Sequence, residues 1–214
     1  MVPYSRLPLR FSLIGCLIAA PVLAAGVPAS NPTTQASLLS PKDAFRTYTT
    51  ALQNGDRNGV SAAVILSDKV QKLIDGQIAY SAIEAKFRAA AVKAFPDADK
   101  DLPDNFPASL AAIDSADVKI DGDTATLTTK QTMQPVKLRR QDGVWKVDLA
   151  AMYGDAVIDE VINFRKAFAE VMEQMSDDVG HGKFTDYNDV RSNLEQRLKM
   201  RLAMPPADEA TTKP

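Results

Sequence analysis

The sequence has little of the residue types that identify most metal proteins and many enzymes. Its 214 residues include one Cys and one His. A single Cys excludes an intrachain disulfide framework and a CxxC site, and a single His excludes HExxH and multi-histidine zinc sites. The 25 Lys and Arg residues nearly balance the 27 Asp and Glu residues, so there is no basic surplus for nucleic acid. We expect no metal, no cofactor and no nucleic-acid partner.

Motifs for phosphate binding and nucleophilic catalysis are also missing. The chain has no P-loop, no GxGxxG and no GxSxG segment. Hydrophobic residues make up 45% of the sequence, an ordinary share that excludes wholesale disorder. The sequence therefore predicts a folded protein to which no catalytic residue can be assigned.

Residues 1–26 have the three-part pattern of a signal peptide. Two Arg residues precede the apolar run 11–25, and small side chains around Ala24 offer a cleavage point. The run is shorter than the roughly 20 residues of a membrane span. The pattern predicts export, to the periplasm or outside the cell, and a mature chain without a transmembrane segment. Cleavage after Gly26 and an uncleaved N-terminal anchor are the alternatives.

A lipoprotein anchored at Cys16 is a further alternative, because the residues from Leu13 to Cys16 resemble a bacterial lipobox. Two features argue against it. The apolar stretch between Arg10 and Cys16 is short, and residues 17–25 remain apolar where a lipoprotein normally continues into a polar tether. We therefore predict cleavage near Ala24 and no lipid on Cys16.

Composition divides the remaining chain into four parts. Residues 27–39 are polar and rich in Pro and Ser, which predicts a flexible linker, and residues 205–214 predict a disordered tail. Between them we expect an α+β domain over 40–150 and a C-terminal helical hairpin over 151–204.

Helical signals come first in the domain. Ser40 and Pro41 are a favoured N-cap and first helical residue, and Gly55 can take a left-handed C-terminal cap. Pro96 ends the last of these helices. The expected helices run from Ser40 to Asn54, through Val60 to Val64, from Ser67 to Gly76, and from about Gln77 to Phe95.

An acidic segment, residues 96–107, follows these helices. Its alternating aspartates superficially suggest a calcium loop, but the EF-hand needs Gly at position six and Glu at position twelve. Counted from the first aspartate, these positions hold Leu102 and Ala108. We predict a solvated acidic loop. Its aspartates are Asp97, Asp99, Asp101 and Asp104.

Four short β-rich segments then predict an antiparallel meander: 117–120, 124–129, 134–140 and 144–147. Asp-Gly turns join the first segment to the second and the third to the fourth. One face of such a sheet can stay wet, whereas its apolar face needs a helical layer. Trp145 alternates with Val147 and is expected on the apolar face.

After the meander the hydrophobic period becomes helical again. A stripe with alternating steps of four and three residues predicts a long amphipathic helix over about 151–176. A second helix, about 185–203, places Val190, Leu194 and Leu198 on one side. We expect the two to form a hairpin that packs on the domain. The stripe consists of Val157, Val161, Phe164, Phe168, Val171 and Met175.

The order of helices before an Asp-Gly-linked meander resembles the nuclear transport factor two-like superfamily. The segment from Asp142 to Asp148 (DGVWKVD) matches a near-terminal strand common there, and the segment from Ala51 to Asp56 matches a common helix end. The resemblance covers about 41–150. It implies helices packed on the concave face of a bent antiparallel sheet, forming a cone with a pocket at its mouth. The sequence departs from the family in showing no convincing strand between the early helices and in adding the hairpin.

The resemblance leaves two classes of function open. Ketosteroid isomerase-like enzymes of this fold use a pocket Asp with a Tyr or second acid, but no local signature places those roles here. Our first hypothesis is a non-catalytic module that binds a small apolar ligand or a protein partner, with self-association possible. The alternative is an isomerase- or hydratase-type enzyme. A pocket with a buried carboxylate of raised pKa favours the enzyme, and an interior filled by Phe and Leu favours the module.

Two further groups of residues are candidate sites. His181 lies close to Asp177 and Asp178, which suggests either an exposed loop or a weak metal site, and we favour the loop. The basic cluster 137–140 is either a wet strand face or an anion site, and we favour the strand face.

Aromatic side chains could line a ligand platform or fill the core. Trp145, Phe45 and Phe87 recur at the spacing of buried positions, so we predict core.

Overall fold

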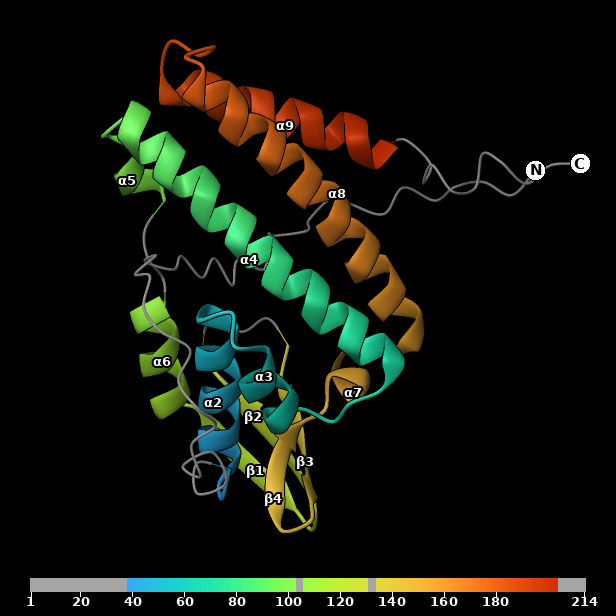
Figure 1. The fold of residues 1–214 in the computed structure, drawn as a ribbon. Coiled ribbons are helices and arrows are strands. Elements are labelled where there is room, and N and C mark those ends of the chain that lie inside the picture. The colour runs from blue at the N-terminus through green and yellow to red at the C-terminus, as the bar shows by residue number, and fades with distance from the viewer. Residues whose placement is uncertain (1–37, 103–105, 131–133, 204–214) are drawn as a thin grey trace, which may run out of the picture.

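The computed structural model describes residues 38–102, 106–130 and 134–203 (Figure 1). The predicted signal peptide, the question of Cys16 and the predicted tail from 205 onward lie outside these residues. So does nearly all of the predicted linker.

The first two helices form where the capping residues predict them. Helix α2 (Pro41–Gln53) begins at Ser40, whose side chain accepts a hydrogen bond from the Asp43 N–H. It ends before Gly55, which has a φ of +64°. Helix α3 (Arg57–Ala63) is capped by Asp56 through the Gly59 N–H at 3.0 Å.

Helix α4 (Asp68–Ala94) is one continuous helix, so the predicted break at Gly76 is wrong. A glycine inside a helix costs only about 1 kcal/mol relative to Ala. Buried residues lie on both sides of it, including Leu73 and Ile74 before it and Gln77 after it. Their burial outweighs the local preference of Gly76 for a helix end.

The acidic segment is partly helical, which corrects the prediction of a loop over 96–107. Helix α5 (Ala98–Asp101) is anchored by Ala98, which is completely buried. Arg88 on α4 holds the turn by pairing with Asp99 at 2.8 Å and donating to the Leu102 carbonyl. A further helix, α6 (Phe106–Asp114), has no counterpart in the sequence prediction.

The predicted meander is confirmed. Strands β1 (Asp117–Asp121), β2 (Thr124–Thr128), β3 (Val136–Gln141) and β4 (Val144–Val147) form an antiparallel sheet in the order β1-β2-β3-β4. Gly122 and Gly143 take positive φ in the two tight turns.

One face of the sheet carries the buried side chains and packs on helices. Trp145 is 2% exposed, and Leu127 and Val147 are completely buried. Helices α2 and α3 contact β4 and lie beside the sheet (Figure 1). We call α2, α3, α6, α7 and the sheet the head.

A short parallel bridge joins the segment after α3 to the sheet. Val64 pairs with Val147, and the Ile65 N–H donates to the Val147 carbonyl at 3.0 Å. This bridge lies where the sequence gives no convincing strand.

The predicted helix over 151–176 is two helices. Asp148 caps α7 (Leu149–Tyr153) by accepting from the Ala151 N–H at 2.9 Å. Gly154, with a φ of +75°, then separates α7 from α8 (Asp155–Gly180). Helix α9 (Tyr187–Ala203) follows.

Helices α4 and α8 run parallel, side by side along most of their length (Figure 1). Lys69 pairs with Asp159 at 2.7 Å near their starts, and Lys86 pairs with Asp177 at 3.2 Å further along. Helix α9 returns antiparallel on α8 and completes the predicted hairpin. We call α5, α8, α9 and the part of α4 from Ser81 onward the helical arm.

Two clusters of buried apolar residues stabilise the molecule. The first fills the head and includes Val70, Leu73 and Ile74 from the start of α4. The second lies in the helical arm. Its buried members are Phe87, Ala91, Ala98, Phe168, Val171, Met172, Met175, Val179 and Val190. Among the residues described, no helix has both the length and the apolar character needed to cross a membrane.

Candidate functional site

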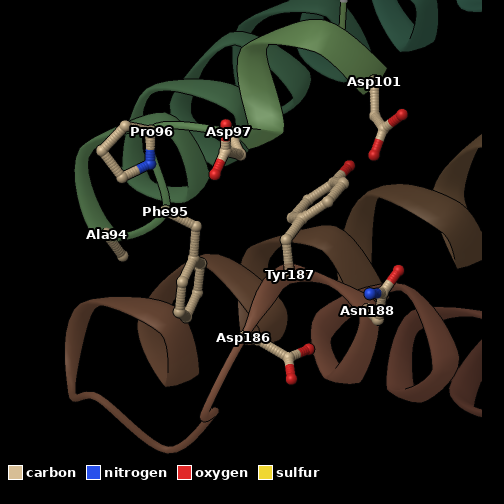
Figure 2. Close-up of a pocket in the computed structure, with 8 residues that line it drawn as sticks. All are labelled: Ala94, Phe95, Pro96, Asp97, Asp101, Asp186, Tyr187 and Asn188. Atoms are coloured by element: carbon tan, nitrogen blue, oxygen red, sulfur yellow. The ribbon is translucent and has the colours of Figure 1, made fainter.

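A hollow of about 360 Å³ lies at the tip of the helical arm, between the end of α4, α5 and the start of α9 (Figure 2). The hollow lies between two segments that are far apart in the sequence, residues 94–101 and 186–188. Its lining residues are Ala94, Phe95, Pro96, Asp97, Asp101, Asp186, Tyr187 and Asn188.

Helix ends position both walls of the hollow. Phe95 is the C-cap of α4, and its N–H donates to the Ala91 carbonyl at 2.7 Å. On the opposite wall, Asp186 accepts a hydrogen bond from the Asp189 N–H at 2.9 Å at the start of α9. The local sequence therefore fixes where each wall begins, and the packing of α4, α8 and α9 brings the walls together.

Two aromatic rings project into the space from opposite walls (Figure 2). Phe95 and Tyr187 are partly buried, and each ring packs against the apolar cluster of the arm. The Tyr187 hydroxyl points toward Asp101. Burial, and then the Asp101 carboxylate, raise the pKa of Tyr187, so its hydroxyl remains a hydrogen-bond donor at neutral pH.

Three aspartates, Asp97, Asp101 and Asp186, line the hollow, and its lining residues include no cation. Arg191 is the cation close enough to lower the pKa of Tyr187, by less than burial and Asp101 raise it. Asp97 pairs with Lys100 at 2.8 Å, and the hydrogen bond from that lysine lowers the Asp97 pKa. This pair is exposed, so water screens it. Within the described ranges, Asp101 and Asp186 have no ion-pair partner. Acidic groups beside aromatic faces suit a positively charged ligand.

The structure places His181 and its neighbours in helix-end contacts. His181 is the C-cap of α8, and its ring Nδ1 lies 2.6 Å from the Asp177 carbonyl oxygen. Asp177 pairs with Lys86, and Asp178 pairs with Lys183 and Arg197. Both aspartates thus join the helices of the arm. The part of the chain that the structure describes contains no group of three metal-ligating side chains.

The aromatic candidates lie in the core, as predicted. Trp145 and Phe87 are each 2% exposed, and Phe45 packs against the head cluster. The guanidinium of Arg140 lies 4.6 Å from the centre of the Trp145 ring.

The basic cluster is a strand face that borders a second hollow of about 290 Å³ on β2 and β3. Lys137 donates to the Thr126 hydroxyl at 3.1 Å, and Arg139 pairs with Asp148 at 3.1 Å. Because these cations already have partners within the protein, the geometry favours the strand-face interpretation.

Glu84 was not among the residues predicted from the sequence, and it is the carboxyl group with the most strongly shifted pKa among those described. It is 5% exposed on α4, and burial raises its pKa to about 7. Glu84 lines neither hollow. Its spacing of three from Phe87 and seven from Ala91 puts it on the apolar face, and that spacing was the available signal.

No family model, curated protein or solved structure matches this chain. The resemblance to the nuclear transport factor two-like superfamily therefore stays a prediction.

Proposed function

We propose that this chain is an exported, non-catalytic binding module that takes a positively charged group into the hollow at the tip of its helical arm. The observation that carries the proposal is the convergence of Phe95 and Tyr187 with three carboxylates. Export rests on the signal-peptide pattern of residues 1–26.

Two features support binding over catalysis. The apolar face of the sheet is filled by buried side chains such as Leu127, Leu138 and Trp145, which is the arrangement expected of an interaction module. The carboxyl group with a pKa near neutrality, Glu84, lies outside the hollow. A general acid or base has to lie within reach of its substrate.

The chemistry of the hollow selects a cation with an apolar body. A cation over an aromatic face gains about 0.5–2 kcal/mol, and a nearby carboxylate adds to this. The volume suits one long side chain or one small organic ammonium ion. The shared chemistry is therefore an ammonium or guanidinium group, free or carried by a protein partner.

Binding can be tested with two probes, phenyltrimethylammonium and a short lysine- and arginine-rich peptide. Amide NMR signals of residues 94–101 and 186–188 should shift with either probe. Benzyl alcohol, which is neutral, should leave them in place. Tighter binding of the peptide would identify a protein partner, and tighter binding of the small ion a free ligand.

The double variant Asp97→Asn with Asp101→Asn should bind the probes about fivefold or more weakly, equivalent to about 1 kcal/mol. Asp186 is left in place because it caps α9. The matched control is Asp121→Asn with Asp123→Asn at the exposed β1–β2 turn. Equal affinities of the two double variants would contradict the proposal.

We also propose that residues 41–150 have the nuclear transport factor two-like architecture. Helices packed on one face of a four-stranded meander support it. The parallel bridge between Val64 and Val147 adds a strand-like contact at the place where the sequence departed from the family.

A further inference from the structure

Glu84 lies in the interface between α4 and α8 without the partners that a buried carboxylate needs. The side chain is 5% exposed, and its Oε2 accepts no hydrogen bond from any described residue. An ionised carboxylate in such a place loses its hydration and gains nothing in return. A protonated carboxyl group avoids most of this cost.

The surroundings of Glu84 are apolar. Phe87 follows it on the same face of α4 and is 2% exposed in the arm's cluster. Tyr80 precedes it by one turn, and the Tyr80 ring lies 5.5 Å from the Phe168 ring on α8. Burial, and then the charge of Glu84, raise the pKa of Tyr80, so this hydroxyl stays neutral. A tyrosine is either neutral or negative, so it offers a carboxylate no counter-charge in either form.

Most cations of the helical arm form ion pairs with groups other than Glu84. The charge of Arg165 on α8 lowers the pKa of Tyr80, whereas the pKa of Glu84 is raised by burial alone. The ion pairs on these elements join Lys86 with Asp177, Arg88 with Asp99, Arg197 and Lys183 with Asp178, Lys199 with Glu195, and Arg201 with Glu170. The charged residues of the arm that form no ion pair among the described residues include Lys93, Glu160, Lys166, Glu173, Asp189 and Arg191.

Glu84 also lies at the boundary between the two apolar clusters. Val70, Leu73 and Ile74 tie the first part of α4 to the head, whereas Phe87 and Ala91 tie the last part to the arm. A charge at residue 84 therefore weakens the contact of α4 with α8 without touching the packing of the sheet.

We propose that Glu84 is a pH-sensitive latch: in its neutral form it lets α4 pack on α8, and its ionisation loosens the tip of the helical arm while the head stays folded. The latch is a property of the arm and does not depend on what the hollow binds.

Hydrogen exchange of the intact protein tests the latch, because protection factors report local opening. Between about pH 5.5 and about pH 8.5, amides of residues 85–94 and 168–179 should lose about thirtyfold of their protection. This factor follows from a folded pKa of about 7 against 4.5 when the group is exposed. Amides of β2 and β3 should stay better protected than those of the arm at both pH values, because they exchange only when the head also unfolds.

The variant Glu84→Gln should abolish this pH dependence, since an amide of the same shape does not ionise. Glu173→Gln, at an exposed position of α8, is the matched control and should behave as the wild type. Equal protection of the wild-type arm at both pH values would overturn the proposal. So would arm amides that are as well protected as those of the sheet at pH 8.5, or a pH dependence that persists in Glu84→Gln.

Discussion

Single residues in this molecule owe their roles to where the helices and the sheet put them. Trp145 and Glu84 are buried to a similar extent, at 2% and 5% exposure. The indole fills the centre of the head, whereas the carboxyl group must stay neutral to remain where it is. The same degree of burial therefore stabilises one residue and makes the other sensitive to pH.

Replacing Trp145 by Ala should lower the free energy of unfolding by about 3–5 kcal/mol, because it empties a large site in the core. The urea midpoint of the variant measures this loss. Lys146→Ala, the neighbouring position on β4, should change it by less than about 0.5 kcal/mol. A midpoint unchanged in Trp145→Ala would mean that the indole contributes nothing to the packing of the head.

Ionisation of Glu84 should also appear in overall stability. Its folded pKa is raised above its unfolded value, so its proton favours the folded state, and stability falls as pH rises from about 4.5 to about 7. The full loss is about 3 kcal/mol, converted from the shift at about 1.4 kcal/mol per unit. Denaturation of wild type and Glu84→Gln across this range measures it. Parallel pH profiles of the two proteins would contradict the assignment to Glu84.

At the scale of elements, local signals predicted the caps and turns, and tertiary packing decided the rest. Ser40, Asn54 and the Asp-Gly turns act where the sequence indicated. Gly76 does not end a helix, because buried neighbours on both sides hold α4 together. The acidic segment became helical where Ala98 reaches the arm's cluster. Charge pattern alone carries no information about such a contact.

Gly76 and Gly55 differ in backbone conformation, so replacing each by Ala should change stability in opposite directions. A Cβ at Gly76, inside α4, would meet no atom within 4 Å, so Gly76→Ala should stabilise the protein by up to about 1 kcal/mol. Gly55 has a φ of +64°, so Gly55→Ala should destabilise it by about 1 kcal/mol or more. Thermal unfolding measures both. A destabilised Gly76→Ala would indicate that this face of α4 is covered in solution.

On the scale of the whole molecule, the sequence predicted most of the head and the hairpin of α8 and α9. It did not predict how α4 packs against α8. The parallel pairing of α4 with α8 depends on contacts between distant segments, and no local pattern encodes it. The candidate site depends on the same pairing, because Asp97 and Asp186 lie 89 residues apart in the sequence. The sequence therefore shows that acidic and aromatic residues are present in both segments, but it does not show that the two segments lie side by side.

The apolar stripe of α8 is only partly covered. Phe168, Val171 and Met175 are buried against α4 and α9, whereas Val157 and Phe164 are 42% and 40% exposed. The reason is the length of α9, which runs alongside the later part of α8 and pairs through Arg201 with Glu170 near its own end.

Removing α8 and α9 should nevertheless unfold more than the hairpin. Three fully buried side chains of the stripe contribute about 5–9 kcal/mol of gross burial, similar to the stability of a whole domain. A chain ending at Ala150 would leave Phe87 and the apolar face of α4 in water. We expect it to aggregate or to lose cooperative unfolding by circular dichroism.

The full chain carrying Lys199→Ala, which removes an exposed pair with Glu195, should melt as the wild type does. A shortened chain that stayed soluble and melted like the full one would make the hairpin a separate module. Its exposed apolar residues would then be explained better by a partner than by the head.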